Sequence, residues 1–367
     1  MKKRKFGFAL TLILAAGTLL SACGQADEDQ DTTEGTPETA NEFKVGMVTD
    51  TGGVDDKSFN QSAWEGLQKF GEDFDLTEGE EYRYLQSNKE DEYVPNLGTF
   101  ADAGYDLTYG IGFLLEDSVQ TIAEQNPDAN FALVDSLLLD ENFSPVFLDN
   151  VANITFKEQQ GSFLVGVVAA KHTETNKVGF VGGVDSPLIK KFESGFKAGV
   201  KSVNPDIEIV SQYADSFNDA AKGTAIADTM YRQDIDIIYH AAGGTGNGVF
   251  TEAKNRKKSG ENVWVIGVDR DQYEEGLPEN VTLTSMVKRV DVAVYEVSKR
   301  AMEGDFPGGE EVVFGLEEDG IGIAPTTENV SEEALSLVEE YQQKILSGDL
   351  VVPSTDDEYE EFLGSLK

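Results

Sequence analysis

Acidic, aromatic and amide side chains stand directly after a short apolar run near the start of this chain. Asp50 follows the run Val45–Val48, and Phe59 and Asn60 open the next segment, in which apolar residues recur at helical spacing. A carboxylate, an aromatic face and an amide suit a flat, neutral molecule with polar edges better than a phosphate. The segment therefore predicts a strand, a polar loop and a helix that meet a ligand at their junction.

Other apolar runs end in similar side chains. Phe113, Asp135 and Asp269 each come just past a predicted strand, and Phe217 lies in a polar loop. Two Phe rings from opposite domains could hold an aromatic base between them, because stacking supplies both area and geometry. Asp269 suits a pair of sugar hydroxyls, and Lys288 could donate to the same hydroxyls or neutralise Asp269.

Residues typical of catalysis are scarce. The chain has two histidines and one cysteine, so neither a zinc cage nor a Cys–His nucleophile can be assembled. We expect His172 to be an exposed helix cap, whereas His240 could serve the ligand or the fold equally well. The glycine-rich segment 243–248 follows a strand but does not match Gly-x-Gly-x-x-Gly, although its small residues would let backbone N–H groups approach a ligand.

The elements that carry these side chains alternate between strand and helix, which is typical of parallel sheets with helices on both faces. The second half of the chain repeats the plan of the first. Val178–Val181 corresponds to Val45–Val48, and the Gly-Gly-Val-Asp turns at 52–55 and 182–185 follow them. Two α/β domains with a cleft between them are expected, with the segments after Thr282 returning to complete both, and hence several crossings.

The N-terminus predicts export. Residues 1–22 combine a basic start with an apolar stretch and end in small residues before Cys23, which resembles a bacterial lipoprotein signal with Cys23 as the lipidation site. Residues 23–42 are acidic and polar, as in a disordered tether. The net charge of −39 argues against a nucleic-acid partner.

The segment Gly-Gly-Val-Asp-Asp-Lys-Ser-Phe-Asn-Gln-Ser-Ala-Trp-Glu-Gly-Leu, which ends at Leu67, closely resembles the basic membrane protein family of substrate-binding lipoproteins, similar to purine nucleoside receptors of ABC importers. Matches at 110–113, 131–136, 160–166, 177–183 and 267–269 extend the resemblance over about residues 43–346. It implies an α/β type I periplasmic-binding fold, with two doubly wound parallel-sheet lobes and a hinge of three strands. The lobes would be residues 43–155 with about 286–318, and 156–285 with about 319–350.

The resemblance also implies a nucleoside held between the lobes. Asp50 and Asn60 would contact the base, Phe59 and Phe217 would stack on it, and Gly243, Asp269 and Lys288 would contact the ribose. Phe113, Asp135 and Phe192 are placed in the site by loop position only. Phe192 and Phe217 compete for the second stacking role, and the sequence leaves this choice open.

These observations lead us to expect a lipid-anchored, extracytoplasmic receptor on a bacterial cell membrane. It would capture nucleosides, with purine nucleosides as the first expectation, and, as a monomer, deliver them to an ABC permease and its ATPase, with no cofactor and no metal. A choice between purine and pyrimidine, and the type of cell envelope, stay open. A receptor for another solute, such as a sugar or signalling molecule, a sensor for a membrane kinase and an adhesin are alternatives.

A nucleoside hydrolase is an alternative from a different class. Asp50, Asp55 and Asp56 in one loop could bind a metal for such a reaction. Lys57 beside them and the lack of a nearby histidine favour a solvated or helix-capping role instead.

Overall fold

The structure, a computed structural model, describes residues 43–366. The predicted signal peptide, the lipidation site at Cys23 and the tether lie outside the described residues. No helix among residues 43–366 is long and apolar enough to cross a membrane.

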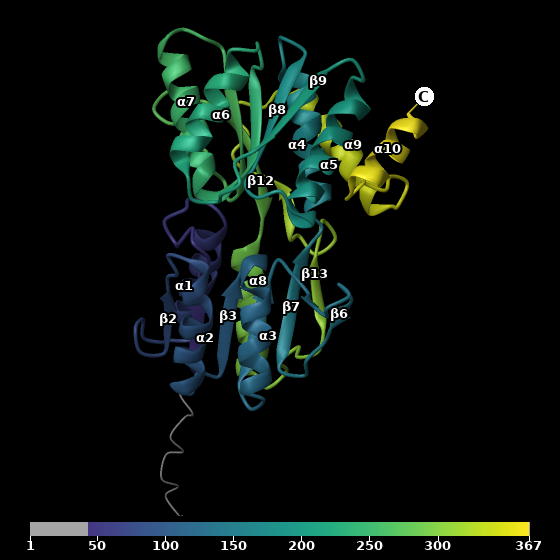
Figure 1. Cartoon of the computed structure of the whole chain (residues 1–367). Helices are drawn as coiled ribbons and strands as arrows, with labels where there is room; N and C mark the ends of the chain where they lie inside the picture. The colour runs from purple at the N-terminus through teal and green to yellow at the C-terminus, as the bar shows by residue number, and fades with distance from the viewer. Residues whose placement is uncertain (1–42, 367) are drawn as a thin grey trace, which may run out of the picture. The chain divides into compact units, whose positions relative to one another are not determined.

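The first lobe is built on a six-stranded parallel sheet (Figure 1) with the order β13-β7-β4-β3-β1-β2. Its strands are β1 (Val45–Val48), β2 (Tyr82–Leu85), β3 (Leu107–Ile111), β4 (Asn130–Val134), β7 (Val151–Phe156) and β13 (Glu311–Phe314). Every residue of β1, β3 and β7 is buried, as expected for parallel strands covered on both faces.

The second lobe repeats this plan with the order β14-β12-β11-β10-β8-β9. Its strands are β8 (Lys177–Gly182), β9 (Glu208–Tyr213), β10 (Ile237–Ala241), β11 (Trp264–Asp269), β12 (Thr282–Lys288) and β14 (Ile321–Ile323). Only β14 runs antiparallel to its neighbour, β12. The predicted fold class, two α/β lobes with mainly parallel sheets, is confirmed.

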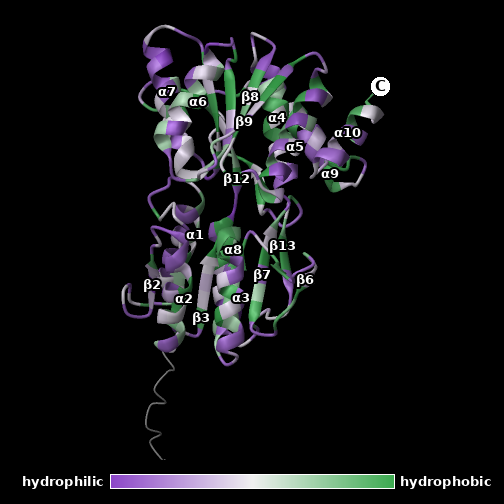
Figure 2. Cartoon of the chain, in the orientation of Figure 1, coloured by the Kyte–Doolittle hydropathy of each residue, from purple (hydrophilic) through white to green (hydrophobic). Residues whose placement is uncertain are grey.

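Helices cover the two sheets (Figure 1). They are α1 (Phe59–Asp73), α2 (Tyr93–Asp102), α3 (Glu116–Gln125), α4 (Glu158–His172), α5 (Pro187–Val203), α6 (Ala220–Tyr231), α7 (Gly246–Lys258), α8 (Val290–Met302), α9 (Glu332–Leu346) and α10 (Asp356–Ser365). A small hairpin, β5 (Leu138–Leu139) with β6 (Pro145–Val146), stands apart from both sheets. Figure 2 shows hydrophobic residues in strands such as β7 and β8, and hydrophilic residues on helices such as α5 and α7.

The chain crosses between the lobes at residues 156–158, 288–290 and 314–321. The second crossing follows Lys288, because β12 pairs with β11 through residue 287 and with β14 through Lys288. This is slightly later than the expected start of the returning segment at about residue 286. After this crossing α8 packs against α1, and after the third α9 packs against α4.

Local sequence explains where the helices near the site begin. Ser186 caps α5, since its Oγ accepts a hydrogen bond of 3.3 Å from the Ile189 backbone N–H, and Pro187 occupies the first helical position. At α1 the cap is not Ser58 but Asp56, whose carboxylate accepts hydrogen bonds from the backbone N–H groups of Ser58, Asn60 and Gln61. Ser58 occupies the position directly before α1, but its hydroxyl makes no capping bond because it donates to Asp269 in the second lobe.

Candidate functional site

A cavity with about 540 Å³ of unoccupied space lies between the carboxyl ends of the two sheets. The cavity is lined by every residue that the sequence placed in the site: Asp50, Phe59, Asn60, Phe113, Asp135, Phe192, Phe217, Gly243, Asp269 and Lys288.

The strands position these side chains because each strand ends at the cavity. In the first lobe, Asp50 follows β1 and Asp135 follows β4; in the second, Asp269 ends β11 and Lys288 ends β12. Asp135 and Asp269 both have positive φ, 67° and 65°, in the left-handed region that aspartate tolerates better than most residues. The two lobes thus contribute carboxylates in the same backbone conformation to one site.

One end of the cavity holds a network of Asp50, Asp56 and Asn60. The Asn60 Nδ2 donates to Asp50 Oδ1 at 2.8 Å and to Asp56 Oδ2 at 3.0 Å. The Gly52 backbone N–H also donates to Asp50 Oδ1, at 2.8 Å. Burial, opposed by these hydrogen bonds, raises the pKa of Asp50 to about 6. Asp56, which holds the start of α1 in place, also has its pKa raised by burial.

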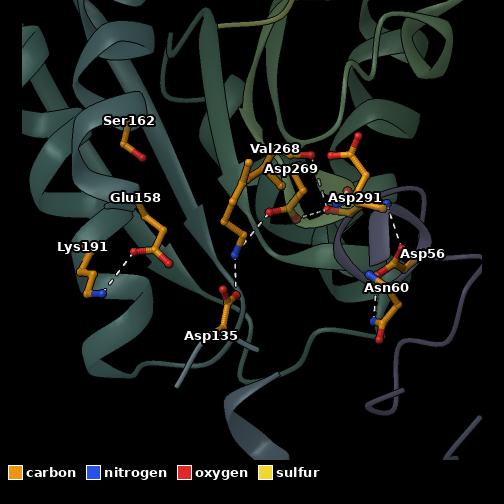
Figure 3. A network of polar contacts seen from close by, with 12 residues as sticks. Asp56, Asn60, Asp135, Glu158, Ser162, Lys191, Val268, Asp269 and Asp291 are labelled. Carbon is orange, nitrogen blue, oxygen red and sulfur yellow. Dashed lines mark hydrogen bonds and ion pairs between the residues drawn. The ribbon is translucent and has the colours of Figure 1, made fainter. Parts of the chain in front are cut away.

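The opposite end holds a buried ion network around Lys288 (Figure 3). The Lys288 ammonium pairs with Asp135 Oδ2 and lies 3.7 Å from Asp269 Oδ1, so it joins carboxylates of both lobes. The Ser58 hydroxyl donates to the other oxygen of Asp269, Oδ2. Burial raises the pKa of Asp269 to about 6, against the opposing effect of Lys288 and Ser58. The pKa of Lys288 is raised because the carboxylates around it outweigh its burial.

The first crossing carries a further buried carboxylate. Glu158 is fully buried at the start of α4, and its Oε2 lies 3.2 Å from the Lys191 ammonium (Figure 3). Lys191 also donates to the Phe156 carbonyl, so it fixes α5 to the crossing. Burial raises the pKa of Glu158, although Lys191 and Lys288 oppose this.

Aromatic rings line the space between these polar ends. The rings of Phe113 and Phe217, one from each lobe, meet edge to face with centroids 6.0 Å apart. The Lys288 ammonium lies 4.6 Å from the centroid of Phe59 and 5.3 Å from that of Phe192. Such an arrangement can accept a flat ring and a neighbouring group that forms hydrogen bonds.

Hydrogen bonds across the cleft join the two lobes. The Asn218 amide donates to the Thr51 carbonyl at 2.7 Å, and the Asn247 amide to the Asp56 carbonyl at 3.1 Å. Gln272 donates to the Lys57 carbonyl at 2.8 Å. All three contacts involve the loop that follows β1, and Arg270 of the second lobe adds an ion pair with Glu65 in α1.

The remaining candidates for chemistry do not reach the cavity. His240 is fully buried beneath it and its Nε2 lies 3.1 Å from Gln272 Oε1; burial lowers its pKa to about 4. His172 is not the exposed cap that was expected, because its Nε2 accepts a hydrogen bond from the Ser331 backbone N–H at the start of α9. Among residues 43–366, no group of three or more His, Cys, Asp or Glu side chains is arranged to hold a metal.

The sequence did not point to several other lining residues. They are Gly52, Gly112, Leu114, Leu188, Ile189, Ala241, Ala242 and Val268. Asp56 also lines the cavity, and the sequence suggested it only as a metal ligand or a helix-capping residue. The internal repeat could have indicated two of them, since Leu188 and Ile189 occupy the first turn of α5 as Phe59 and Asn60 do in α1. Gly112 has a φ of 106°, a backbone conformation that residues with a side chain rarely adopt, so the loop after β3 needs glycine.

Comparisons with known proteins agree with this architecture. Residues 43–356 match the family model described as "ABC transporter substrate-binding protein PnrA-like". The chain is 52% identical to the CD4+ T-cell-stimulating antigen of Listeria innocua over 96% of this chain and 99% of the relative. It is 40% identical to the ABC transporter nucleoside-binding protein BmpA of Lactococcus lactis, over 96% and 100% of the two chains.

A solved structure is similar as well. The ABC transporter solute-binding protein from Aeropyrum pernix superposes with a TM-score of 0.76 at 28% identity, covering 88% of this chain and 97% of that one. Together with the family match over most of the chain, this establishes that the protein belongs to the PnrA-like family of ABC transporter substrate-binding proteins, also called basic membrane proteins.

Proposed function

We propose that this protein is a lipid-anchored receptor that captures nucleosides between its lobes and delivers them to an ABC importer. The observation that carries the proposal is the cavity itself, where aromatic rings lie between two polar ends. A nucleoside has the same division, with a flat base and a sugar rich in hydroxyls. The nucleoside-binding relative from Lactococcus lactis supports the same ligand class.

The base would lie among the Phe rings, with its polar edge toward Asp50 and Asn60. Phe59 is our first candidate for the stacking partner, with Phe217 or Phe192 on the other face. The ribose would lie near Gly243, Asp269 and Lys288, where a carboxylate and an ammonium can bind adjacent hydroxyls. Asp135 and Phe113 complete the wall of the cavity.

Binding would couple to closure of the cleft. The ligand would contact side chains of both lobes, and it would therefore favour the closed state over an open one. We expect the protein to act as a monomer, to catalyse no reaction and to be held at the outer face of the membrane through a lipid on Cys23. The closed form would then be recognised by a permease driven by an ATPase.

Isothermal titration tests the ligand class. The chain from Phe43 onward, which contains all but the first residue of the compact unit, is unfolded to remove bound ligand, refolded and titrated with nucleosides, free bases, ribose and other sugars. We expect tight binding of nucleosides and weak binding of bases or ribose alone, because only a nucleoside reaches both ends of the cavity. Heat with a sugar or another solute and none with any nucleoside would contradict the proposal.

The anchor needs a separate test in cells. Mass spectrometry of the full chain should find a lipid on Cys23, and the Cys23→Ser variant should be released from the membrane. An unmodified thiol at Cys23 in the wild-type protein would contradict the anchor but not the ligand class.

A further inference from the structure

The orientation of the Asn60 amide is fixed by its surroundings. Its Nδ2 donates one hydrogen bond to Asp50 and one to Asp56, which uses both N–H groups. The reverse orientation would place the amide oxygen against two carboxylates, so it is excluded electrostatically. The Asn60 Oδ1 is left as the free atom, and it is buried without a partner among the described residues. A buried acceptor of this kind needs a donor, because leaving it unpaired is unfavourable.

Asp50 presents a second acceptor beside it. Its Oδ1 receives the Gly52 N–H and the Asn60 amide, whereas no residue in the described part of the chain donates to its Oδ2. Asp50 and Asn60 both line the cavity and are 6% and 2% exposed. This end of the cavity thus offers two acceptors on residues that are hydrogen-bonded to each other, Asn60 Oδ1 and Asp50 Oδ2, and both N–H groups of the Asn60 amide are already committed.

We propose that the Asp50–Asn60 acceptor pair selects nucleosides whose base edge carries neighbouring N–H donors, as in guanosine, and that adenosine binds only when Asp50 holds a proton. The inference rests on the proposed nucleoside function. Guanine presents N1–H and its 2-amino group side by side, which matches two acceptors. Adenine presents an unprotonated N1 beside its amino group, so N1 would face an ionised carboxylate unless Asp50 donated a proton to it.

The groups around Asp50 allow this proton to be present near neutral pH. Asp56 and Asp135 add negative charge, while the Gly52 N–H and the Asn60 amide stabilise the ionised form. The Tyr93 hydroxyl also faces Asp50, but it stays neutral because burial and this carboxylate raise its pKa. The balance raises the pKa of Asp50 to about 6, so both protonation states are accessible to experiment.

The two nucleosides should then respond to pH in opposite directions. Guanosine binds the ionised form of Asp50, and adenosine binds the protonated form. The ratio of their affinities follows the ratio of the two forms, so it should rise about tenfold in favour of guanosine for each unit of pH increase. Asp269 also titrates in this range, but it faces the common ribose and its effect cancels in the ratio.

The test is a calorimetric titration of the ligand-free protein with guanosine and with adenosine at several values between about pH 5.5 and pH 8. The bases of unbound guanosine and adenosine do not change their protonation in this pH range. We expect the affinity ratio to increase about 300-fold across the range. A ratio that stays constant, or adenosine binding as tightly as guanosine at the upper end, would overturn the inference and leave the nucleoside function standing. Failure of both nucleosides to bind would overturn both proposals.

Two variants make the assignment specific. Asp50→Asn offers an amide donor in place of the titrating carboxylate, so it should favour adenosine and remove the pH dependence of the ratio. Asp135→Asn removes a different carboxylate of the same cavity, and it should weaken both nucleosides while the ratio keeps its slope. If Asp135→Asn removed the slope and Asp50→Asn did not, the acceptor pair would be wrongly assigned. The wild-type series decides the question even if either variant fails to fold.

Discussion

Replacing Lys288 by Met should destabilise the protein strongly, because it leaves buried carboxylates without their counter-ion. The Lys288 side chain is 2% exposed and faces Asp135 and Asp269, with the ammonium 3.7 Å from the latter. At an effective dielectric constant of about 20, one such pair is worth about 4 kcal/mol before the opposing desolvation of the ammonium. Breaking a buried pair from one side typically costs about 3 to 5 kcal/mol, which we take as the expected loss of unfolding free energy.

The effect should depend on pH. Asp269 and Glu158 already have raised pKa values, and losing the ammonium would raise them further. An acid whose pKa is higher in the folded than in the unfolded state destabilises the fold when it is ionised, that is, at a pH above both values. This destabilisation decreases as the pH falls, because protonation removes the buried charge. The deficit of Lys288→Met should therefore be larger at about pH 8 than at about pH 5.

Urea unfolding followed by tryptophan fluorescence measures the loss, since Trp64 lies in α1 and Trp264 in β11, one in each lobe. With a slope of about 3 kcal/mol/M, the midpoint should fall by about 1 M or more. Lys69→Met is the matched control, because the Lys69 side chain is 58% exposed and pairs with Asp73 on the surface. Equal midpoints for the wild type and Lys288→Met, or an equal shift in the control, would refute the reasoning.

Three further predictions follow from single contacts. A Cβ at Gly183 would lie 2.2 Å from the Phe217 ring, so Gly183→Ala should displace the ring and weaken nucleoside binding at least tenfold in calorimetry, whereas Gly322→Ala, with open space around it, should not. Asn218→Ala removes a hydrogen bond between the lobes and should weaken binding about fivefold without lowering the thermal midpoint by more than a degree or two; unchanged affinity would contradict its role in closure. The His240 ring should show no NMR titration between about pH 8 and pH 5, because burial lowers its pKa to about 4. The stability that the neutral ring contributes should be fully present above about pH 6.5 and lost as the pH falls toward 4. An NMR titration midpoint of His240 at about pH 6.5 would contradict this.

Much of the fold could be predicted because its signals are local. The largely apolar runs of β1, β3 and β10 correspond to strands that are buried along their whole length, and the residues directly after them could be placed at the carboxyl edge. The repeat around Val45 and Val178 also corresponds to strands in equivalent places, since β1 and β8 each lie second from the end of a sheet.

Interactions between distant segments were out of reach of such patterns. The local sequence suggests that Ser58 caps a helix, yet its hydroxyl binds Asp269, which is 211 residues away. The local sequence suggests that His172 is an exposed polar residue, yet its ring joins α4 to the start of α9 through the hydrogen bond from the Ser331 N–H. The helix α10 at the C-terminus was not predicted, because its few apolar residues, Tyr359 among them, matter only once they pack against α5.

The candidate site shows the same division. The type of each side chain and its place after a strand could be read from the sequence, whereas its partners could not. The sequence suggested Lys288 as a donor near Asp269, but the structure also pairs it with Asp135, 153 residues away in the first lobe. The commitment of both Asn60 N–H groups to Asp50 and Asp56 likewise depends on how the loop after β1 folds back on the first turn of α1.

The most direct test of the central proposal is a crystal structure of the protein with guanosine bound. We predict density for one nucleoside in the cavity between the lobes, with the base edge at Asp50 and Asn60, the ring against Phe59, and the ribose hydroxyls at Asp269 and Lys288. An empty cavity at saturating guanosine, or a ligand bound elsewhere on the surface, would contradict the account.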